Sequence, residues 1–259
     1  MNPQAAADWL YASIQARQTF ADPPGGLGTT LADAYAIQEA LVARMEGDDG
    51  PAVGWKVALT SPVMQQMCGV DHPCEGAVLR GRVHQSPAAC DTSKLGRLGV
   101  EAEIALVVGQ DMPESGSPYT TANVAACIAA AHPAIELVDD RNADYSQFNA
   151  AKLIASNSLN AGIVLGPASE NWQSLDLAAL KGAMLIDGAV VAEGTGADIL
   201  GHPLNAIVWL ANSLNARGRM LRAGDVVMCG SFVRTQFPAA GQSVTCRVES
   251  LGDATLAVR

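Results

Sequence analysis

The chain has 259 residues, of which 49% are hydrophobic and 16% charged, and its formal net charge is −10. The hydrophobic fraction excludes a chain that is disordered throughout, because it is high enough to form a core. The acidic balance disfavours nucleic-acid binding, since phosphate backbones repel a negative surface. No apolar run approaches the ~20 residues that cross a bilayer, so we expect no membrane partner.

Targeting and redox signals point to a cytoplasmic protein. The N-terminus lacks a basic start and carries Asp8 early, which does not fit a signal peptide. The six cysteines are scattered without a C-x-x-C pair. In a chain of this length they predict reduced thiols and disfavour a zinc knuckle.

Residues 1–52 are predicted to form a small N-terminal helical region. Pro3 suits a first helical turn, and Thr30 can cap a second helix. Residues 53–259 are predicted to form a larger β-rich catalytic domain, and we expect the two regions to make one continuous structural unit.

The second region is predicted to be rich in strands with a few helices among them, and together with the N-terminal helices this indicates an α+β fold. Strands are expected at 53–59, 99–108, 133–138, 162–165, 183–186 and 189–192, with further short strands from 225 to 259. Helices are expected after Ser61-Pro62 and at 121–131, 147–155 and 203–216, the last with His202 as its cap. Asp187-Gly188 joins two of the strands and predicts a tight hairpin.

The strand at 99–108 carries two acids, Glu101 and Glu103. Strand alternation places both on one face, about 7 Å apart. Two buried carboxylates repel each other and lose hydration, and a divalent cation relieves both costs. The alternative is an exposed strand face, where paired glutamates are ordinary.

Glu136 interrupts the next predicted strand in the same way. Three acids on two buried strands can supply half of an octahedral oxygen shell, which leaves positions for water and a bidentate ligand. The alternative for Glu136 is a salt bridge to a base such as Arg141. Asp139 and Asp140 follow on a predicted loop and are expected to be solvated or to cap.

Lys56 lies between Trp55 and Val57 in a predicted strand. An apolar setting of this kind lowers the pKa of a lysine and suits acid–base chemistry. The alternative is a structural ion pair with a neighbouring acid.

Several other site types find little support in the sequence. The pattern lacks a phosphate-binding glycine loop and a G-x-S-x-G nucleophile elbow. The four histidines are dispersed, and Asn157, Asn160 and Asn205 lie at predicted element ends, where asparagine usually caps.

An ordered set of motifs resembles the 2-keto-4-pentenoate hydratases and 2-oxo-3-enedioate decarboxylases of the fumarylacetoacetate hydrolase superfamily. The resemblance extends from about Ala34 to the C-terminus. The segments that carry it are Gly54-Trp-Lys-Val-Ala-Leu-Thr-Ser61, Gln65-Gln66, Gly69-Val-Asp-His-Pro73, Glu101-Ala-Glu-Ile-Ala-Leu-Val, Pro133-Ala-Ile-Glu-Leu-Val-Asp139, Asn157 to Gly162, Gly194-Thr-Gly, Leu200-Gly-His-Pro-Leu-Asn-Ala206, Leu221-Arg-Ala-Gly-Asp-Val-Val227 and Gly230-Ser231.

The resemblance implies a mixed β-roll core with an N-terminal helical region, and assembly as a homo-oligomer. It implies a Mg²⁺ or Mn²⁺ site at Glu101, Glu103 and Glu136, with Lys56 in the catalytic pocket. It also implies substrate-binding roles for Thr60, Ser61, Asn157 and Ser231.

One step departs from the pattern of these hydratases, in which an Asp-aromatic-Gly step follows the Asp-His-Pro motif. This chain has Cys74-Glu75-Gly76 there. Either Glu75 replaces that acid as a catalytic residue, or the acid of the pocket is lost. A shift of one residue would reverse its direction in a strand but not in a loop.

The implied activity is hydration of 2-hydroxypenta-2,4-dienoate to 4-hydroxy-2-oxopentanoate in aromatic catabolism. The alternatives are a 2-oxo-3-enedioate decarboxylase, an acylpyruvate C–C hydrolase, or a non-catalytic subunit of a hydratase–decarboxylase complex. The expected partners are the small dienoate substrate, further copies of the chain, and a partner decarboxylase or aldolase.

Overall fold

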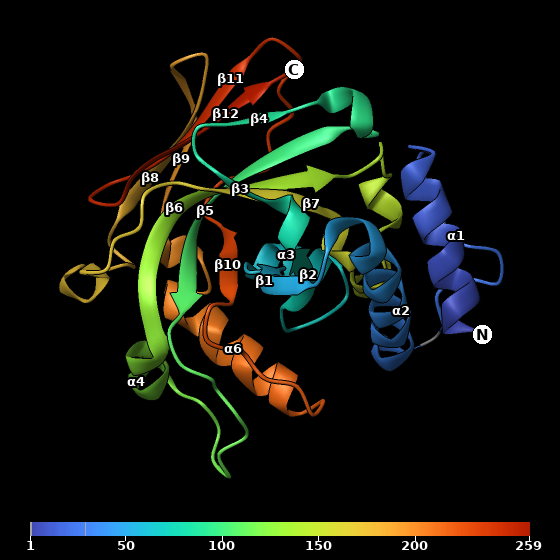
Figure 1. Ribbon diagram of the computed structural model, residues 1–259, viewed down its shortest axis with the longest axis horizontal. Helices are drawn as coiled ribbons and strands as arrows, with labels where there is room; N and C mark the ends of the chain where they lie inside the picture. The colour runs from blue at the N-terminus through green and yellow to red at the C-terminus, as the bar shows by residue number, and fades with distance from the viewer. Residues whose placement is uncertain (1, 29) are drawn as a thin grey trace.

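A computed structural model describes residues 2–28 and 30–259 of the chain. Two N-terminal helices, α1 (Pro3–Gln15) and α2 (Leu31–Asp49), pack together at one side of the molecule (Figure 1). The hydroxyl of Thr30 accepts the N–H of Asp33 at 3.1 Å, and the Asp33 carboxylate accepts the N–H of Thr30 at 3.0 Å. This capping box starts α2 where the sequence predicts it.

A mixed, seven-stranded sheet forms the centre of the fold, in the order β2-β1-β10-β5-β6-β7-β3 (Figure 1). Its strands are β1 (Ala52–Ala58), β2 (Cys74–Leu79), β3 (Val83–Gln85), β5 (Leu98–Val108), β6 (Ile128–Asp139), β7 (Asn160–Leu165) and β10 (Val226–Ser231). β1 is parallel to β10, and β5 is antiparallel to both β10 and β6. The strands β1, β10 and β6 therefore run in one direction and end at the same edge of the sheet.

The side chain of Asn157 closes this sheet into a roll. Its Oδ1 accepts the N–H of Ala77 at 2.7 Å, and its Nδ2 donates to the Ala77 carbonyl at 2.9 Å. The amide thereby continues the ladder at the edge of β2, as a further strand would. Because Asn157 lies three residues before β7, β2 and β7 come close together although four strands separate them in the strand order.

A five-stranded sheet and helix α6 (Pro203–Asn215) cover the outer side of the roll (Figure 1). The strands of this sheet, in spatial order, are β4 (Ala88–Cys90), β12 (Gly252–Val258), β11 (Ser243–Val248), β8 (Lys181–Ile186) and β9 (Ala189–Thr195). Asp187 and Gly188 have φ values of 51° and 81°, as the predicted tight hairpin requires. The Nδ1 atom of His202 accepts the N–H of Leu204 at 3.0 Å, which confirms this residue as the cap of α6.

The prediction of a helix over 121–131 is wrong. Helix α4 covers only Thr121–Val124, and β6 already begins at Ile128. Alanine favours a helix, but residues 128–132 pair with β5, with a register shift between Ile128 and Ala130, and this tertiary pairing overrides the local preference. Helices α3 (Pro62–Met67) and α5 (Ala150–Ala155) lie inside their predicted regions. Strand β2 was not predicted.

Within the described ranges, no helix combines the length and the apolar character that crossing a bilayer requires.

Candidate active site

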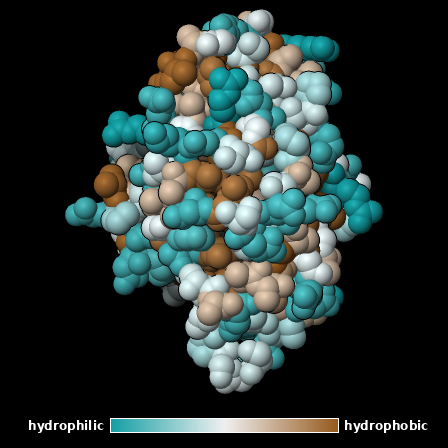
Figure 2. Space-filling model, turned by 90° about the vertical axis from the view of Figure 1, so that its left-hand side faces the viewer, coloured by the Kyte–Doolittle hydropathy of each residue, from teal (hydrophilic) through white to brown (hydrophobic). Residues whose placement is uncertain are grey.

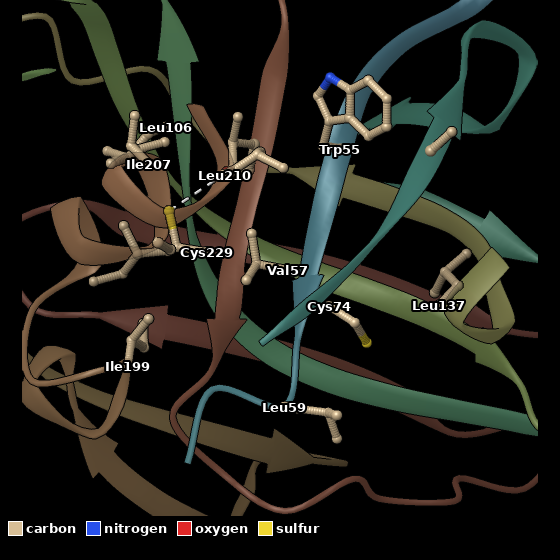
Figure 3. Packing of buried hydrophobic residues seen from close by; sticks show 14 of the residues in the cluster. Trp55, Val57, Leu59, Cys74, Leu106, Leu137, Ile199, Ile207, Leu210 and Cys229 are labelled. Carbon is tan, nitrogen blue, oxygen red and sulfur yellow. Dashed lines mark hydrogen bonds between the residues drawn. The ribbon is translucent and has the colours of Figure 1, made fainter. Parts of the chain in front are cut away.

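The register of β1 and β2 separates two faces of the roll. Lys56 pairs with Gly76, and Val57 pairs with Glu75. Paired residues project to the same face, so Lys56 lies on one face while Val57 and Glu75 lie on the other. Figure 3 shows Val57 on the side of Ile207 and Leu210 of α6. We call the face with Lys56 the inner face and the face with Val57 the outer face.

Three acids of β5 and β6 form one cluster. Glu101 and Glu136 are direct cross-strand partners, and Glu103 lies two residues further along β5. One carboxylate oxygen from each lies within 4.8 Å of the others. Glu103 and Glu136 are buried and Glu101 is half-buried. The structure therefore brings together the three acids that the sequence singled out.

Each carboxylate of this cluster has one oxygen held by a protein donor. The N–H of Gly230 donates to Glu103 Oε2 at 2.8 Å, and Asn160 Nδ2 donates to Glu136 Oε1 at 2.9 Å. The hydroxyl of Thr235 donates to Glu101 Oε1. The second oxygens of Glu103 and Glu136 are buried and find no donor among the described residues. Such buried, unpaired oxygens are what a cation would bind.

Lys56 is the cation nearest to the cluster. Its Nζ lies 3.4 Å from Glu136 Oε1, and its side chain is buried. Burial by itself lowers the pKa of Lys56, but Glu136, Glu101 and Glu103 together raise it above the ordinary value. The expected lowering is therefore outweighed, and Lys56 is an ammonium group at pH 7. Glu136 pairs with Lys56 rather than with Arg141.

Lys56 does not compensate the whole charge of the cluster. Three carboxylates face one ammonium group, which leaves two negative charges for one divalent cation to balance. Burial raises the pKa of Glu136 to about 7, against the attraction of Lys56. Burial and the neighbouring Glu136 raise the pKa of Glu103 well above its usual range. Without a cation, protons thus take the place of the missing positive charge.

Glu75 lies outside this cluster. It belongs to a strand, so its direction is opposite to that of Lys56. Its Oε2 accepts the hydroxyl of Tyr35 at 2.8 Å, and its Oε1 pairs with Arg217. The Arg217 guanidinium stacks over the Tyr35 ring, 4.0 Å from its centroid. Glu75 therefore fastens α2 and the end of α6 to the outer face of β2.

Cys74 takes the place on the inner face that Glu75 leaves. It pairs with Ala58, two residues from Lys56 on the same side of β1. Figure 3 shows its sulfur pointing away from Ile207 and Leu210. Burial raises the pKa of this thiol to about 12, although Lys56 lowers it. Cys74 is therefore a neutral thiol on the inner face at pH 7.

Four hydroxyl and amide side chains were predicted to bind substrate, and three of them form hydrogen bonds with backbone groups. Asn157 bonds to both polar atoms of the Ala77 peptide. Ser231 donates to a backbone carbonyl, and Ser61 accepts the N–H of Met64 at 3.4 Å as the cap of α3. Thr60 is buried and packs against Gly230, where any added Cβ would come within 2.4 Å of it. Thr60 is thus next to the donor of Glu103.

Sequence reasoning missed the donors Asn160 and Thr235. Asn160 was interpreted as a cap, yet it is a polar residue that opens an apolar strand, the same signal that identified Glu136. Asp139 and Asp140 were expected to be solvated or to cap; solvation is wrong, since both are buried, but both do accept backbone N–H groups, Asp140 that of Asn142 at 3.0 Å. Asp139 accepts the N–H groups of Gly96 and Arg97 at 3.0 Å, and Asp140 pairs with the Arg97 guanidinium.

Two hollows lie near this site without including its acids. One, of about 350 Å³, is bordered by α1, α2 and Asn160, and the other, of about 670 Å³, lies along α6 beside Tyr35 and Arg217. The chemistry of the inner face is therefore defined by the carboxylate cluster.

Comparison with known proteins supports this assignment of the fold. The family model of the fumarylacetoacetate (FAA) hydrolase C-terminal domain matches residues 78–259. The chain is 35% identical to a 2-keto-4-pentenoate hydratase of Burkholderia vietnamiensis, over 88% of this chain and 85% of the relative. It is 33% identical to a 4-oxalocrotonate decarboxylase of Pseudomonas putida, over 86% of this chain and 83% of the relative.

A solved structure is similar over nearly the whole chain. It is 4-oxalocrotonate decarboxylase from Pseudomonas putida G7, complexed with magnesium and adipate, with a TM-score of 0.90 and 28% identity over 99% of this chain and 97% of the other. These findings confirm the predicted fold class and the resemblance drawn from the motifs. The chain belongs to the fumarylacetoacetate hydrolase family.

Proposed function

We propose that the chain is a divalent-metal-dependent hydratase that adds water to 2-hydroxypenta-2,4-dienoate and forms 4-hydroxy-2-oxopentanoate. One observation carries this proposal. In the cluster of Glu101, Glu103 and Glu136, a protein donor holds one oxygen of each carboxylate, and the buried second oxygens of Glu103 and Glu136 have no donor within the described part of the chain. This is the donor set of a hard cation such as Mg²⁺ or Mn²⁺. Those three residues would hold it.

The bound cation would supply Lewis-acid stabilisation of the negative charge that develops on the 2-oxo group of the substrate. The chain's own contribution is the positioning of that charge and the movement of protons. Gly230, Asn160 and Thr235 fix the three carboxylates by hydrogen bonds. Lys56 is the proton carrier, because it is the ammonium group that contacts the cluster.

In this scheme Lys56 acts twice. Its ammonium gives a proton to C5 of the dienol while the enol hydroxyl loses its own proton to bulk water, and the dienol becomes a 2-oxo-3-enoate. The amine that remains takes a proton from the water that adds at C4, and passes it to C3. A proton from bulk water then restores the ammonium, so the sum of the steps is the addition of one water.

A second candidate is the decarboxylation of a 2-oxo-3-enedioate. It is supported by the decarboxylase relative at 33% identity and by the decarboxylase structure with a TM-score of 0.90. Loss of CO₂ produces the same kind of enolate, so the same cluster serves both reactions. An acylpyruvate hydrolase remains a further alternative. A purely structural subunit would have no use for the two buried carboxylate oxygens, of Glu103 and Glu136, that lack a donor among the described residues.

The loss of dienol absorbance tests the proposal. Purified protein is mixed with 2-hydroxypenta-2,4-dienoate in Mg²⁺ or Mn²⁺ and then in EDTA, and the product is identified by NMR. Metal-dependent formation of 4-hydroxy-2-oxopentanoate is the expected result. Absence of turnover with this substrate, together with CO₂ release from a 2-oxo-3-enedioate, would replace hydration by decarboxylation.

The assembly of the chain is also a proposal. Val63, Met64 and Met67 of α3 are exposed apolar residues. Figure 2 shows hydrophobic residues gathered near the centre of one face, among hydrophilic ones. Exposed apolar patches are typical of surfaces that contact other proteins, and they support a homo-oligomer. Size-exclusion chromatography with light scattering, which measures the molar mass in solution, can test this. A partner decarboxylase or aldolase and a cytoplasmic location stay predictions.

A further inference from the structure

Two polar atoms of the inner face stay unexplained after the cation is considered. Ser158 Oγ and Asn160 Oδ1 are buried, and among the described residues neither makes a hydrogen bond to nitrogen or oxygen; the thiol of Cys74, a weak hydrogen-bonding group, lies within reach of Ser158. Ser158 is 1% exposed and Asn160 is 5% exposed. A buried hydroxyl or amide oxygen without a partner costs about 1–3 kcal/mol. Two of them beside one reactive cluster therefore indicate a ligand that donates and accepts hydrogen bonds.

The position of Asn160 defines where this ligand lies. Its Nδ2 donates to Glu136 Oε1, the same oxygen that Lys56 approaches to 3.4 Å. The amide is planar, so Oδ1 diverges from Nδ2 by the fixed amide angle. Asn160 and Lys56 thus meet at the same carboxylate oxygen, and the second polar atom of the Asn160 amide is an acceptor that Lys56 does not bond.

Ser158 lies on the same face, beside Gly76 of β2. A Cβ added to Gly76 would lie 3.1 Å from Ser158 Cβ, and Gly76 pairs with Lys56. The absence of a side chain at Gly76 allows this close approach. Ser158 and Asn160 therefore border the space around Lys56 from the side of β7.

The backbone of this segment is held in a costly conformation. Asn157, Ser158 and Leu159 have φ values of 53°, 51° and 59°, all in the left-handed region. A non-glycine residue there costs about 1–3 kcal/mol and persists where the surroundings enforce it. The two bonds from Asn157 to Ala77 enforce it here. The consequence of this local strain is that Ser158 reaches the inner face.

We propose that Ser158 and Asn160 bind and orient the water molecule that adds to C4, an inference that rests on the proposed hydratase function. Asn160 Oδ1 accepts one O–H of this water, and Ser158 Oγ donates to its oxygen. The O–C4 bond forms as the C3–C4 π bond breaks, and the leaving water proton reaches C3 through Lys56. Ser158 and Asn160 exchange no proton and act by position.

The proposal is tested by measuring the two steps of the reaction separately. The first step, conversion of the dienol to 2-oxopent-3-enoate, needs no added water, whereas the second step, hydration at C4, does. Ser158→Ala is expected to keep the first step above the uncatalysed rate and to slow hydration about tenfold, as the loss of one positioned hydrogen bond would. NMR should then show released 2-oxopent-3-enoate, which the wild-type protein converts fully.

Ser156→Ala is the matched control. Ser156 is also buried in this segment, but its hydroxyl already donates to the carbonyls of Lys152 at 2.7 Å and Leu153 at 3.1 Å. This variant should hydrate without releasing the intermediate. Calorimetric titration with Mg²⁺ alone should give equal affinities for wild type and Ser158→Ala, since Ser158 does not hold a carboxylate.

Asn160→Ala is the second variant, and it should uncouple the steps and also weaken Mg²⁺ binding, because it releases Glu136. Hydration by Ser158→Ala at the wild-type rate, or equal slowing of both steps, would overturn the water-binding role while leaving the hydratase function in place. Failure of the wild-type protein to hydrate any dienoate would remove the function and this inference together.

Discussion

Buried acids lie on both faces of the seven-stranded sheet, and their surroundings differ. On the outer face, Glu75 has a donor for each oxygen, from Arg217 and Tyr35. On the inner face, Glu103 and Glu136 each keep an oxygen without a donor, and Lys56 is the ammonium group at hand. Burial alone therefore does not mark a reactive acid in this protein. An uncompensated charge does, because the fold keeps it at a cost in stability.

The largest effect is expected from Glu103→Gln, which tests the inner face directly. The amide oxygen can still accept from Gly230, so the fold should persist. Loss of one cation ligand removes several kcal/mol of transition-state stabilisation, which lowers kcat by roughly a thousandfold or more. Dienol absorbance in saturating Mg²⁺ measures this, with circular dichroism as the folding control. Wild-type activity in this variant would contradict the three-glutamate site.

The pH dependence of the thermal stability of the metal-free protein tests whether the inner-face acids are uncompensated. The pKa of Glu136 is raised from 4.5 to about 7, and that of Glu103 is raised as well. Folding therefore favours the protonated acids, and this contribution is lost as pH rises from about 4.5 through 7. The Tm of EDTA-treated protein should fall over this range. Saturating Mg²⁺ should raise Tm more at pH 8 than at pH 5; an equal rise at both would show that the acids do not bind the ion.

Glu75→Gln should show that the outer-face acid contributes to stability and not to catalysis. Removing this charge leaves the Arg217 guanidinium, whose side chain is 24% exposed, without its partner. Breaking such a pair should lower the free energy of unfolding by about 2–3 kcal/mol, as urea denaturation can measure. Because Glu75 points away from Lys56, kcat should change less than threefold. A large loss of kcat in a stably folded variant would instead return Glu75 to the catalytic role suggested by the sequence.

The smallest effect is expected from Ser61→Ala. Its hydroxyl caps α3, so the variant should lose about 0.5–1 kcal/mol of stability, measured by thermal denaturation. The KM for the dienoate should stay unchanged, because the cap uses this hydroxyl. A rise in KM at constant kcat would show that Ser61 contacts the substrate after all.

The sequence predicts the inner cluster because its signal is local. Two glutamates at alternate positions of an apolar strand must share a face, and Glu136 repeats the signal one strand later. The direction of Glu75 could not be predicted, because it depends on whether residue 75 belongs to a strand. That in turn depends on pairing with β1. The role of Asn157 depends on the closure of the roll, which joins segments 80 residues apart in the chain. Asn160 instead reaches Glu136 from the neighbouring strand β7.

The position of β10 in the sheet has a consequence for synthesis of the chain. This strand, at Val226–Ser231, is inserted between β1 and β5, and its Gly230 supplies the donor for Glu103. The ribosome therefore synthesises β10 after both of its neighbours in the sheet, β1 and β5. Until then, the hairpin of β5 and β6 exposes an unpaired edge and three acids. Such long-range pairing slows folding, and a C-terminal truncation before residue 231 would remove the centre of the molecule rather than its end.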